Sequence, residues 1–183
     1  MIRSKKALKG ENIMKKFIKI MSLSLALIMS VMMFASCGLF APKPADDPNE
    51  AYEALKDANY EAQLITNESG SGLGGLISGA SMATLKAAFE IDNDVEIDAI
   101  VVANDSSDML YIFYFANKDD AKDFEEDREE ELKDKIEDLE AKEDDMTAND
   151  YEKAMDELES TIIGRKGSMV WYANSKDIVK AAK

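Results

Sequence analysis

The stretch VEIDAIVVANDSSDMLYIFYF, residues 95–115, decides the fold. Its two arms, 95–103 and 109–115, are rich in β-branched and aromatic residues and place apolar side chains at alternate positions, which is typical of strands. Residues 104–108 between them are Asn, Asp and Ser, which favour turns. The stretch therefore predicts a β-hairpin. One face of its first strand is predicted to carry Val95, Ile97, Ala99, Val101 and Ala103.

Two further strands are predicted on either side of this hairpin. Residues 60–66 alternate apolar and polar side chains, and residues 168–173 follow the turn-forming run 164–167. Residues 82–89 fit a short helix with its apolar side chains on one side, and a strand remains the alternative for them.

The most acidic part of the chain is predicted to be helical. One helical pattern runs from Asn117 toward Lys142, and a second begins after Thr147 with an apolar stripe that ends at Ile162. The two helices are predicted to pair as an antiparallel hairpin. Residues 119–159 hold 21 acidic and six basic side chains. The simplest interpretation of this charge is a solvated helical face; diffuse binding of Ca²⁺ or Mg²⁺ is the alternative, because oxygen ligands suit these cations.

The order of elements indicates an α+β protein. It matches a split β-α-β layout, a ferredoxin-like sandwich in which four strands form one antiparallel sheet with helices on one face. The long acidic helical hairpin takes the place of the second helix in this prediction. A single α+β domain is predicted over residues 50–183, which is a normal length for one domain.

The beginning of the chain has the three parts of an export signal. Lys15 and Lys16 precede an apolar run, residues 20–34, and small residues stand just before Cys37, the single cysteine. The motif Phe34-Ala35-Ser36-Cys37 resembles the lipobox of bacterial lipoproteins. That resemblance implies cleavage before Cys37 and a diacylglycerol on its thiol. An uncleaved membrane anchor and ordinary secretion are the alternatives.

The export signal is predicted to span residues 1–36, and residues 1–13 suggest a start codon assigned too early, with Met14 as the other start. Residues 37–49 are predicted to be the lipidated cysteine and a tether, because all three prolines of the chain fall there and proline-rich spacers are extended. Asp47 is also a good cap for a helix that has Pro48 at its first position.

Two stretches of the predicted domain resemble a known group of proteins. The strand–turn–strand run continues into Ala-Asn-Lys-Asp-Asp-Ala at 116–121, and the last strand reads Gly-Ser-Met-Val-Trp-Tyr at 167–172. Both are similar to uncharacterised small lipoproteins of Gram-positive gut bacteria. The resemblance implies a cell-envelope location and no particular activity.

Composition excludes several classes of function. Without residues 1–36 the chain has 15 basic and 36 acidic side chains, so it repels nucleic-acid phosphates and anionic lipid headgroups. The chain has no histidine, which excludes Ser-His-Asp and Cys-His catalysis and histidine-ligated metals. No cofactor, metal ligand or catalytic residue is predicted.

Three local patterns have features of a binding site. Residues 92–96 place carboxylates at alternate positions, but Ile97 stands where a calcium-binding loop needs glycine, so a turn is the better interpretation. The glycine-rich run 70–75 lacks the lysine of a phosphate-binding loop, so it is interpreted as a flexible loop, with a mobile flap over a groove as the alternative. Six aromatic side chains lie on the predicted strands: Tyr111, Phe113, Tyr114, Phe115, Trp171 and Tyr172. Half of them are expected to belong to the core, and the others could present their rings to a peptide or a glycan.

The expected function is that of a lipoprotein anchored at the extracytoplasmic face of a cell membrane. A non-catalytic binding or accessory role with an envelope protein partner is expected. The alternatives are a carboxylate-dependent envelope hydrolase and a surface protein that binds divalent cations. A hydrolase predicts a deep pocket with two carboxylates at one end of the sheet, whereas a binding protein predicts a shallow aromatic patch.

Overall fold

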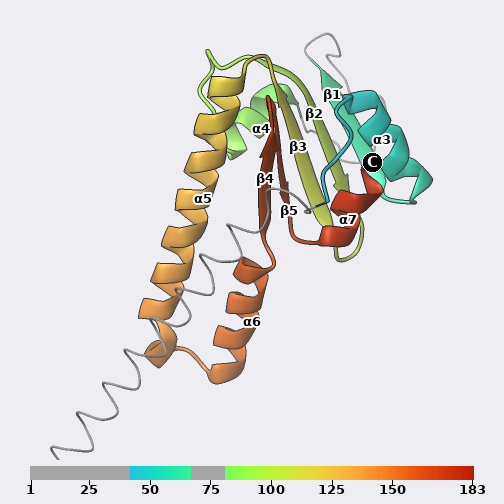
Figure 1. Ribbon diagram of the computed structural model, residues 1–183. Coiled ribbons are helices and arrows are strands. Elements are labelled where there is room, and N and C mark those ends of the chain that lie inside the picture. The colour runs from blue at the N-terminus through green and yellow to red at the C-terminus, as the bar shows by residue number, and fades with distance from the viewer. Residues whose placement is uncertain (1–41, 67–80) are drawn as a thin grey trace, which may run out of the picture. The chain divides into compact units, whose positions relative to one another are not determined.

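The sheet of this protein has five strands in the part of the chain that the structure, a computed structural model, describes: residues 42–66 and 81–183 (Figure 1). Cys37, the predicted leader and the glycine-rich run 70–75 lie outside these residues. The strand order is β1-β2-β3-β5-β4, and every neighbouring pair is antiparallel. The strands are β1 (Glu61–Thr66), β2 (Ile97–Asn104), β3 (Met109–Phe115), β4 (Ile162–Lys166) and β5 (Met169–Ala173).

Five α-helices accompany the sheet within the described ranges. They are α3 (Pro48–Asp57), α4 (Met82–Ala88), α5 (Lys118–Ala141), α6 (Ala148–Glu159) and α7 (Lys176–Ala181), with a 3₁₀ turn at Glu143–Asp145. Each α-helix starts at a side chain that accepts a hydrogen bond from the first turn, which satisfies backbone N–H groups that lack a helical partner. The caps are Asp47, Ser81, Asn117, Thr147 and Ser175. The α+β class and the acidic helical hairpin of α5 and α6 are confirmed, and residues 82–88 form a helix.

The ferredoxin-like prediction is wrong in its strand count and connection. β1 and β2 are direct antiparallel neighbours, in a register that pairs Glu61 with Asn104 and Thr66 with Ala99. A split β-α-β unit needs parallel strands joined by a crossover helix, whereas α4 here joins two antiparallel neighbours. The fifth strand is β4, which the sequence pattern assigned to the end of a helix and a turn. β4 and β5 form a hairpin around Gly167, whose φ of +64° suits glycine.

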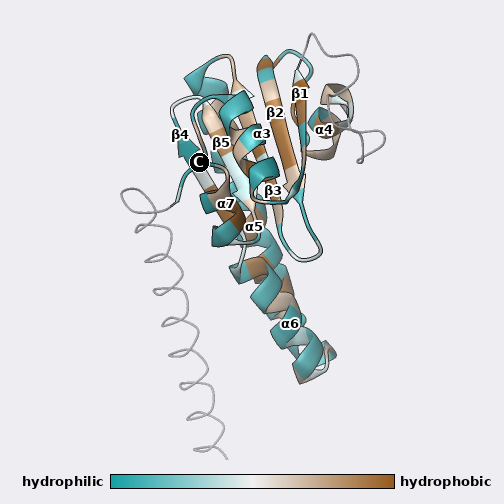
Figure 2. Cartoon of the chain, turned by 90° about the vertical axis from the view of Figure 1, so that its right-hand side faces the viewer, coloured by the Kyte–Doolittle hydropathy of each residue, from teal (hydrophilic) through white to brown (hydrophobic). Residues whose placement is uncertain are grey.

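Helices cover both faces of the sheet, which corrects the prediction of helices on one face. α3 and α7 lie on one side, and α4 and α5 lie on the other (Figure 1). The reason lies in the central strands: residues 99–103 of β2 and 112–115 of β3 are all buried, so both faces need a cover. In Figure 2, β2 is accordingly brown along most of its length, while the α5–α6 hairpin is mostly teal.

A β-bulge changes the face of the first residues of β2. Ile97 pairs with Phe115 and Ala99 pairs with Tyr114, so Asp98 is an extra residue without a partner in β3. Because side chains alternate, one extra residue moves Ile97 to the opposite face from Ala99. Val95 and Ile97 therefore pack on the α4–α5 side, which corrects the single face predicted for 95–103.

The segment before α3 belongs to the folded body. Pro44 is buried, and the backbone N–H of Ala45 donates to the carbonyl of Ala182 at 2.7 Å. The Tyr114 hydroxyl donates to the carbonyl of Ala45 at 2.9 Å, and Lys166 forms an ion pair with Asp46. Residues 44–46, called here the N-terminal clamp, thus join the predicted tether to β3, β4 and the C-terminus. Burial strongly raises the pKa of the Tyr114 phenol, which keeps it a neutral donor.

Candidate functional site

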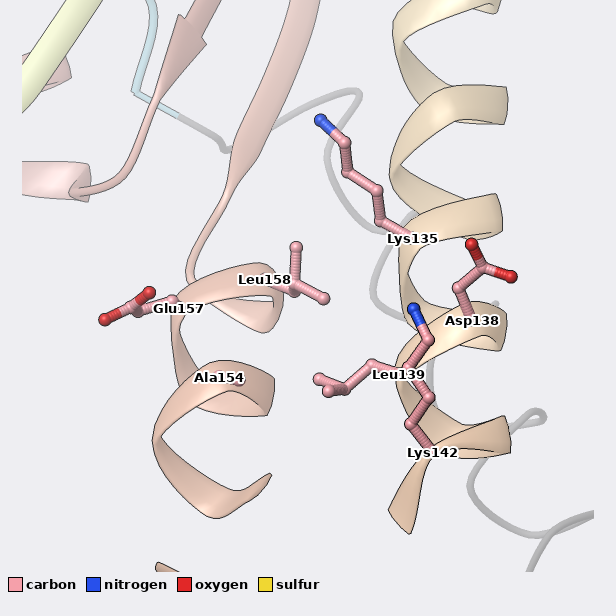
Figure 3. A pocket seen from close by; sticks show the side chains of 7 residues that line it. All are labelled: Lys135, Asp138, Leu139, Lys142, Ala154, Glu157 and Leu158. Atoms are coloured by element: carbon pink, nitrogen blue, oxygen red, sulfur yellow. The ribbon is translucent and has the colours of Figure 1, made fainter. Parts of the chain in front are cut away.

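An open groove lies between α5 and α6, where the hairpin extends beyond the sheet (Figure 1). Its volume is about 350 Å³. Leu139 on α5 and Leu158 on α6 point toward each other across it, and Lys135 and Lys142 lie along its α5 side (Figure 3). The lining is completed by Asp138, Ala154 and Glu157. This hairpin groove is therefore apolar between the helices and charged along its edges.

The apolar residues of the hairpin are covered only in part. Leu132 is buried on α5, but Leu139 and its neighbour Ile136 are half-buried. α6 has no buried residue at all, although it is amphipathic. Its apolar stripe is half-buried throughout: Tyr151, Ala154, Met155 and Leu158.

Most basic side chains of the hairpin are already neutralised within it. Lys135 pairs with Glu131 at 2.5 Å, and Arg128 pairs with the same carboxylate. Lys142, in contrast, has no ion-pair partner among the residues that the structure describes. Desolvation, together with the carboxylates of Glu125 and Glu126, raises the pKa of Glu129. Partial burial of Glu129 is the main cause of this shift, and the neighbouring carboxylates add to it.

A second candidate surface is the aromatic side of the sheet beneath α4. Phe89 follows α4 and packs edge-on against Tyr111 of β3, with ring centroids 4.9 Å apart, and against Tyr172 of β5 at 6.1 Å. These three rings, called here the aromatic patch, are all half-buried. Burial raises the pKa of Tyr111, so its phenol is neutral at physiological pH. The remaining predicted aromatics are buried: Phe113, Tyr114, Phe115 and Trp171.

Two amide side chains lie on the same face of the sheet as the aromatic patch. Gln63 of β1 is only 6 % exposed, and neither its Oε1 atom nor the buried Oδ1 of Asn104 on β2 has a hydrogen-bond partner among the described residues. The strand registers place Gln63 in one row across the sheet with both tyrosines. The row reads Gln63, Val102, Tyr111, Tyr172 and Ile163.

This row combines hydrogen-bonding groups with ring surface. A buried polar atom without a partner costs free energy, so it is satisfied when a donor reaches it. Phenols can donate and accept hydrogen bonds, and ring faces stack on flat groups. Such a row suits a flat ligand with hydrogen-bond donors, such as a sugar or a peptide. Alternation on a sheet with one covered face assigns Gln63 to solvent, so the sequence pattern alone does not indicate it as a site residue.

Residues 92–96, which resemble the start of a calcium-binding loop, lie beside the ammonium group of a lysine of the same chain. The buried Lys86 of α4 donates from its ammonium group to the carbonyls of Asn93 and Val95, at 2.9 and 2.8 Å. The side chains of Asp92, Asp94 and Glu96 are exposed. Within residues 42–66 and 81–183, no three acidic side chains are grouped so that they could hold a metal ion.

The carboxylates that line the hairpin groove do not form the arrangement expected of a hydrolase. Asp138 lies on α5 and Glu157 lies on α6, and the Glu157 side chain points away from α5 (Figure 3). The hydrolase interpretation predicted two carboxylates at one end of the sheet.

Neither a protein-family model, nor a curated protein, nor a solved structure matches this chain. Of the helices in the described ranges, none is long and apolar enough to cross a membrane.

Proposed function

We propose that this protein is a lipoprotein anchored at the extracytoplasmic face of a bacterial cell membrane, where it binds a component of the cell envelope without catalysing a reaction. The anchor in this proposal is Cys37, and its support is the basic start, the apolar run and the small residues before that cysteine. The binding role rests on one observation above all: the buried Gln63, whose Oε1 atom has no hydrogen-bond partner among the described residues, shares a face of the sheet with two half-buried tyrosines.

The N-terminal clamp limits how far the anchored body can be from the membrane. Pro44 is buried in the body, and it follows Cys37 by seven residues. Even a fully extended chain of that length spans no more than about 25 Å. The proposed lipid anchor therefore holds the body close to the headgroups, and only a short part of the predicted tether is left to span that distance.

Replacing Cys37 with alanine is expected to abolish lipid attachment. Cells that express the wild-type chain and receive a radioactive or clickable fatty acid should label this protein, and the Cys37→Ala variant should carry no label and keep its leader. The matched control is Ser36→Ala, which retains a small residue before the cysteine and should still be labelled. Mass spectrometry that finds wild-type Cys37 unmodified behind an intact leader would overturn the proposed anchor.

The binding role predicts a ligand that depends on the aromatic patch. Cell-wall glycan fragments and short peptides, screened separately, should include one that raises the melting temperature of the mature lipoprotein. Replacing Tyr111 and Tyr172 together with alanine should weaken binding of that ligand roughly tenfold or more, because two ring contacts are lost.

The control for this experiment is Tyr151→Ala, which removes a half-buried tyrosine of α6 instead. It should leave the affinity unchanged. A ligand that binds the double variant as well as the wild type would show that the aromatic patch is not its site. If neither panel contains a ligand, the proposed binding role loses its main support.

A further inference from the structure

We propose that four lysines around the N-terminal clamp contact the anionic headgroups of the bilayer, so that this side of the folded body faces the membrane. They are called here the lysine patch: Lys43, Lys166, Lys180 and Lys183. The inference rests on the proposed lipid anchor, which places the protein at a membrane surface, and it is independent of the ligand of the aromatic patch.

The positive charge of the chain is concentrated in its last part. Residues 160–183 hold five basic side chains and a single acidic one, Asp177. Residues 37–159 hold 10 basic and 35 acidic side chains, so the negative charge of the body lies elsewhere. Such a charge asymmetry within one chain suggests interaction with a membrane or a nucleic acid, and the proposed extracytoplasmic location favours the membrane.

The fold brings the N-terminal clamp and this basic segment together. The backbone N–H of Ala45 donates to the carbonyl of Ala182 at 2.7 Å, which places Lys183 beside the clamp. Lys166, at the end of β4, forms an ion pair with Asp46 of the clamp. Basic residues that are distant in the sequence therefore lie on one part of the surface, at the point where the chain enters the body.

Positive charge exceeds negative charge within the patch. Two of its lysines have a carboxylate partner: Lys166 pairs with Asp46, and Lys180 pairs with Asp177. The other two are exposed and have no ion-pair partner among residues 42–66 and 81–183: Lys43 and Lys183. The patch thus carries two positive charges that its own carboxylates do not neutralise.

These lysines are near enough to repel one another. The pKa of Lys43 is lowered, first by its contact with Lys166 and the like charge of that ammonium group, and also by the charge of Lys183. A like charge disfavours the charged form of its neighbour. Phosphate groups placed against the patch would relieve this repulsion.

The net negative charge of the chain does not prevent this contact. Only seven residues separate Cys37 from the buried Pro44, so the proposed anchor holds the clamp close to the headgroups. Exposed charges farther apart than about 8 Å are largely screened at physiological ionic strength. The acidic helix α5 lies on the opposite side of the sheet from α7 (Figure 1), so a headgroup at the patch is affected mainly by the lysines beside it.

Helix α3 limits the patch on one side. It contacts α7 and carries three exposed acidic residues: Glu50, Glu53 and Asp57. An anionic surface repels these carboxylates and attracts the lysines, so the body is expected to tilt until the lysine patch, and not α3, faces the headgroups.

An extended array of phosphates fits this surface better than a single phosphate does. The four lysines are exposed on separate segments, namely the clamp, the end of β4 and the C-terminal segment. Each lysine close to an anionic membrane strengthens attachment roughly fivefold, and these contributions accumulate over the patch. The proposed occupant is therefore the headgroup layer of a bilayer that contains an anionic lipid such as phosphatidylglycerol.

The test compares the reactivity of individual lysines in two membranes. The acylated lipoprotein is reconstituted in nanodiscs of phosphatidylcholine, with or without about one third of phosphatidylglycerol. Acetylation by an N-hydroxysuccinimide ester, followed by mass spectrometry, measures how fast each lysine reacts. The lysine patch is expected to react roughly threefold or more slowly in the anionic nanodiscs, because headgroups shield its ammonium groups, and high salt should remove this protection.

Two lysines of the α5–α6 hairpin are matched controls within the same sample. Lys133 and Lys153 are exposed and ion-paired, as Lys166 and Lys180 are in the patch. Their reactivity is expected to be the same in both kinds of nanodisc. Equal protection of the control lysines and of the patch would show a general effect of the anionic lipid and would overturn the inference.

A double variant tests whether the unpaired charges hold the patch on the membrane. Lys43→Gln combined with Lys183→Gln removes no ion pair of the described residues, so the fold should be unchanged, and circular dichroism checks this. The protection of Lys166 and Lys180 should fall to less than half. The matched variant, Lys133→Gln combined with Lys153→Gln, also removes two exposed positive charges and should leave the protection unchanged.

Soluble polyphosphate distinguishes a lipid surface from phosphate in general. At the same phosphate concentration, polyphosphate added to phosphatidylcholine nanodiscs should protect the patch much less than phosphatidylglycerol does. Equal protection would assign the patch to soluble polyanions and overturn its assignment to the membrane.

The state of Cys37 is read separately by mass spectrometry of the reconstituted protein. A chain without an acyl group would refute the proposed anchor and this inference with it. An acylated chain whose patch reacts equally in both nanodiscs, or whose protection is unchanged in the Lys43 and Lys183 double variant, would refute this inference alone. Neither result bears on the ligand of the aromatic patch.

Discussion

The Gly164→Ala variant is expected to lose about 3 kcal/mol or more of its free energy of unfolding. Gly164 of β4 lies opposite Trp171 of β5, and the indole ring covers the position of the missing side chain. A Cβ atom added there would lie 2.4 Å from Cζ2 of Trp171 and 2.6 Å from Cε2. The ring is rigid and 5 % exposed, so it cannot move aside cheaply.

Denaturant unfolding followed by circular dichroism measures this effect. In a Trp171→Leu background the smaller side chain leaves room for the methyl group, so Gly164→Ala should there cost much less than in the wild type. The comparison variant is Gly167→Ala, whose Cβ would be in ordinary van der Waals contact with Cε of Lys118 at 3.9 Å and would strain only the backbone, at a cost of about 1–2 kcal/mol. Equal losses for Gly164→Ala in both backgrounds would show that the indole is not the cause.

Replacing Lys86 with methionine is expected to cost about 2–4 kcal/mol, because it removes two charge-assisted hydrogen bonds and leaves two carbonyl groups without their donor. Methionine keeps the length and the apolar stem of lysine, so the loss reports on the ammonium group alone. The affected carbonyls belong to Asn93 and Val95, which join α4 to the start of β2. Thermal unfolding measures the change in stability.

The matched control for Lys86 is Lys133→Met on α5. Lys133 is exposed and its ion pair with Glu137 is 3.7 Å long, so its loss should change stability by less than about 0.5 kcal/mol. Hydrogen exchange gives a second readout, because the backbone N–H of Val95 should exchange faster in Lys86→Met than in the wild type. Similar stabilities for the two variants would contradict the assignment of Lys86 as the group that fixes this loop.

The parts of the fold that the sequence predicted correctly are those determined by local chemistry. The β2–β3 hairpin formed as predicted because residues 104–108 can make their own turn: the Asp105 carboxylate accepts hydrogen bonds from the backbone N–H groups of Ser107 and Asp108, both at 2.7 Å. These bonds lower the pKa of Asp105. Helix starts at Asp47 and Asn117 were equally predictable, since a cap and the helix it begins are adjacent in the chain.

The parts that the sequence did not predict depend on residues that are distant in the chain. β4 was assigned to a helix end because Ile162 continues the apolar spacing of α6, and only pairing with β5 makes it a strand. The bulge at Asp98 follows from the register with β3, which the alternation of β2 alone cannot show. A polar residue in an alternating strand is expected to face water. In the structure, α4 and α5 cover the face of the sheet that carries Gln63, and its side chain is buried. The alternation of β1 alone cannot show this cover.

The hydrogen bond between Ala45 and Ala182 brings the beginning of the folded body next to its end. A fluorescent protein or epitope fused after Lys183 would therefore lie beside the position where the chain enters the folded body. Force applied between the N-terminal attachment point and such a fusion would act first on this bond and on the Tyr114 hydroxyl beside it. The clamp would thus open before the central strands were loaded, and a pulling experiment should record its release as the earliest event.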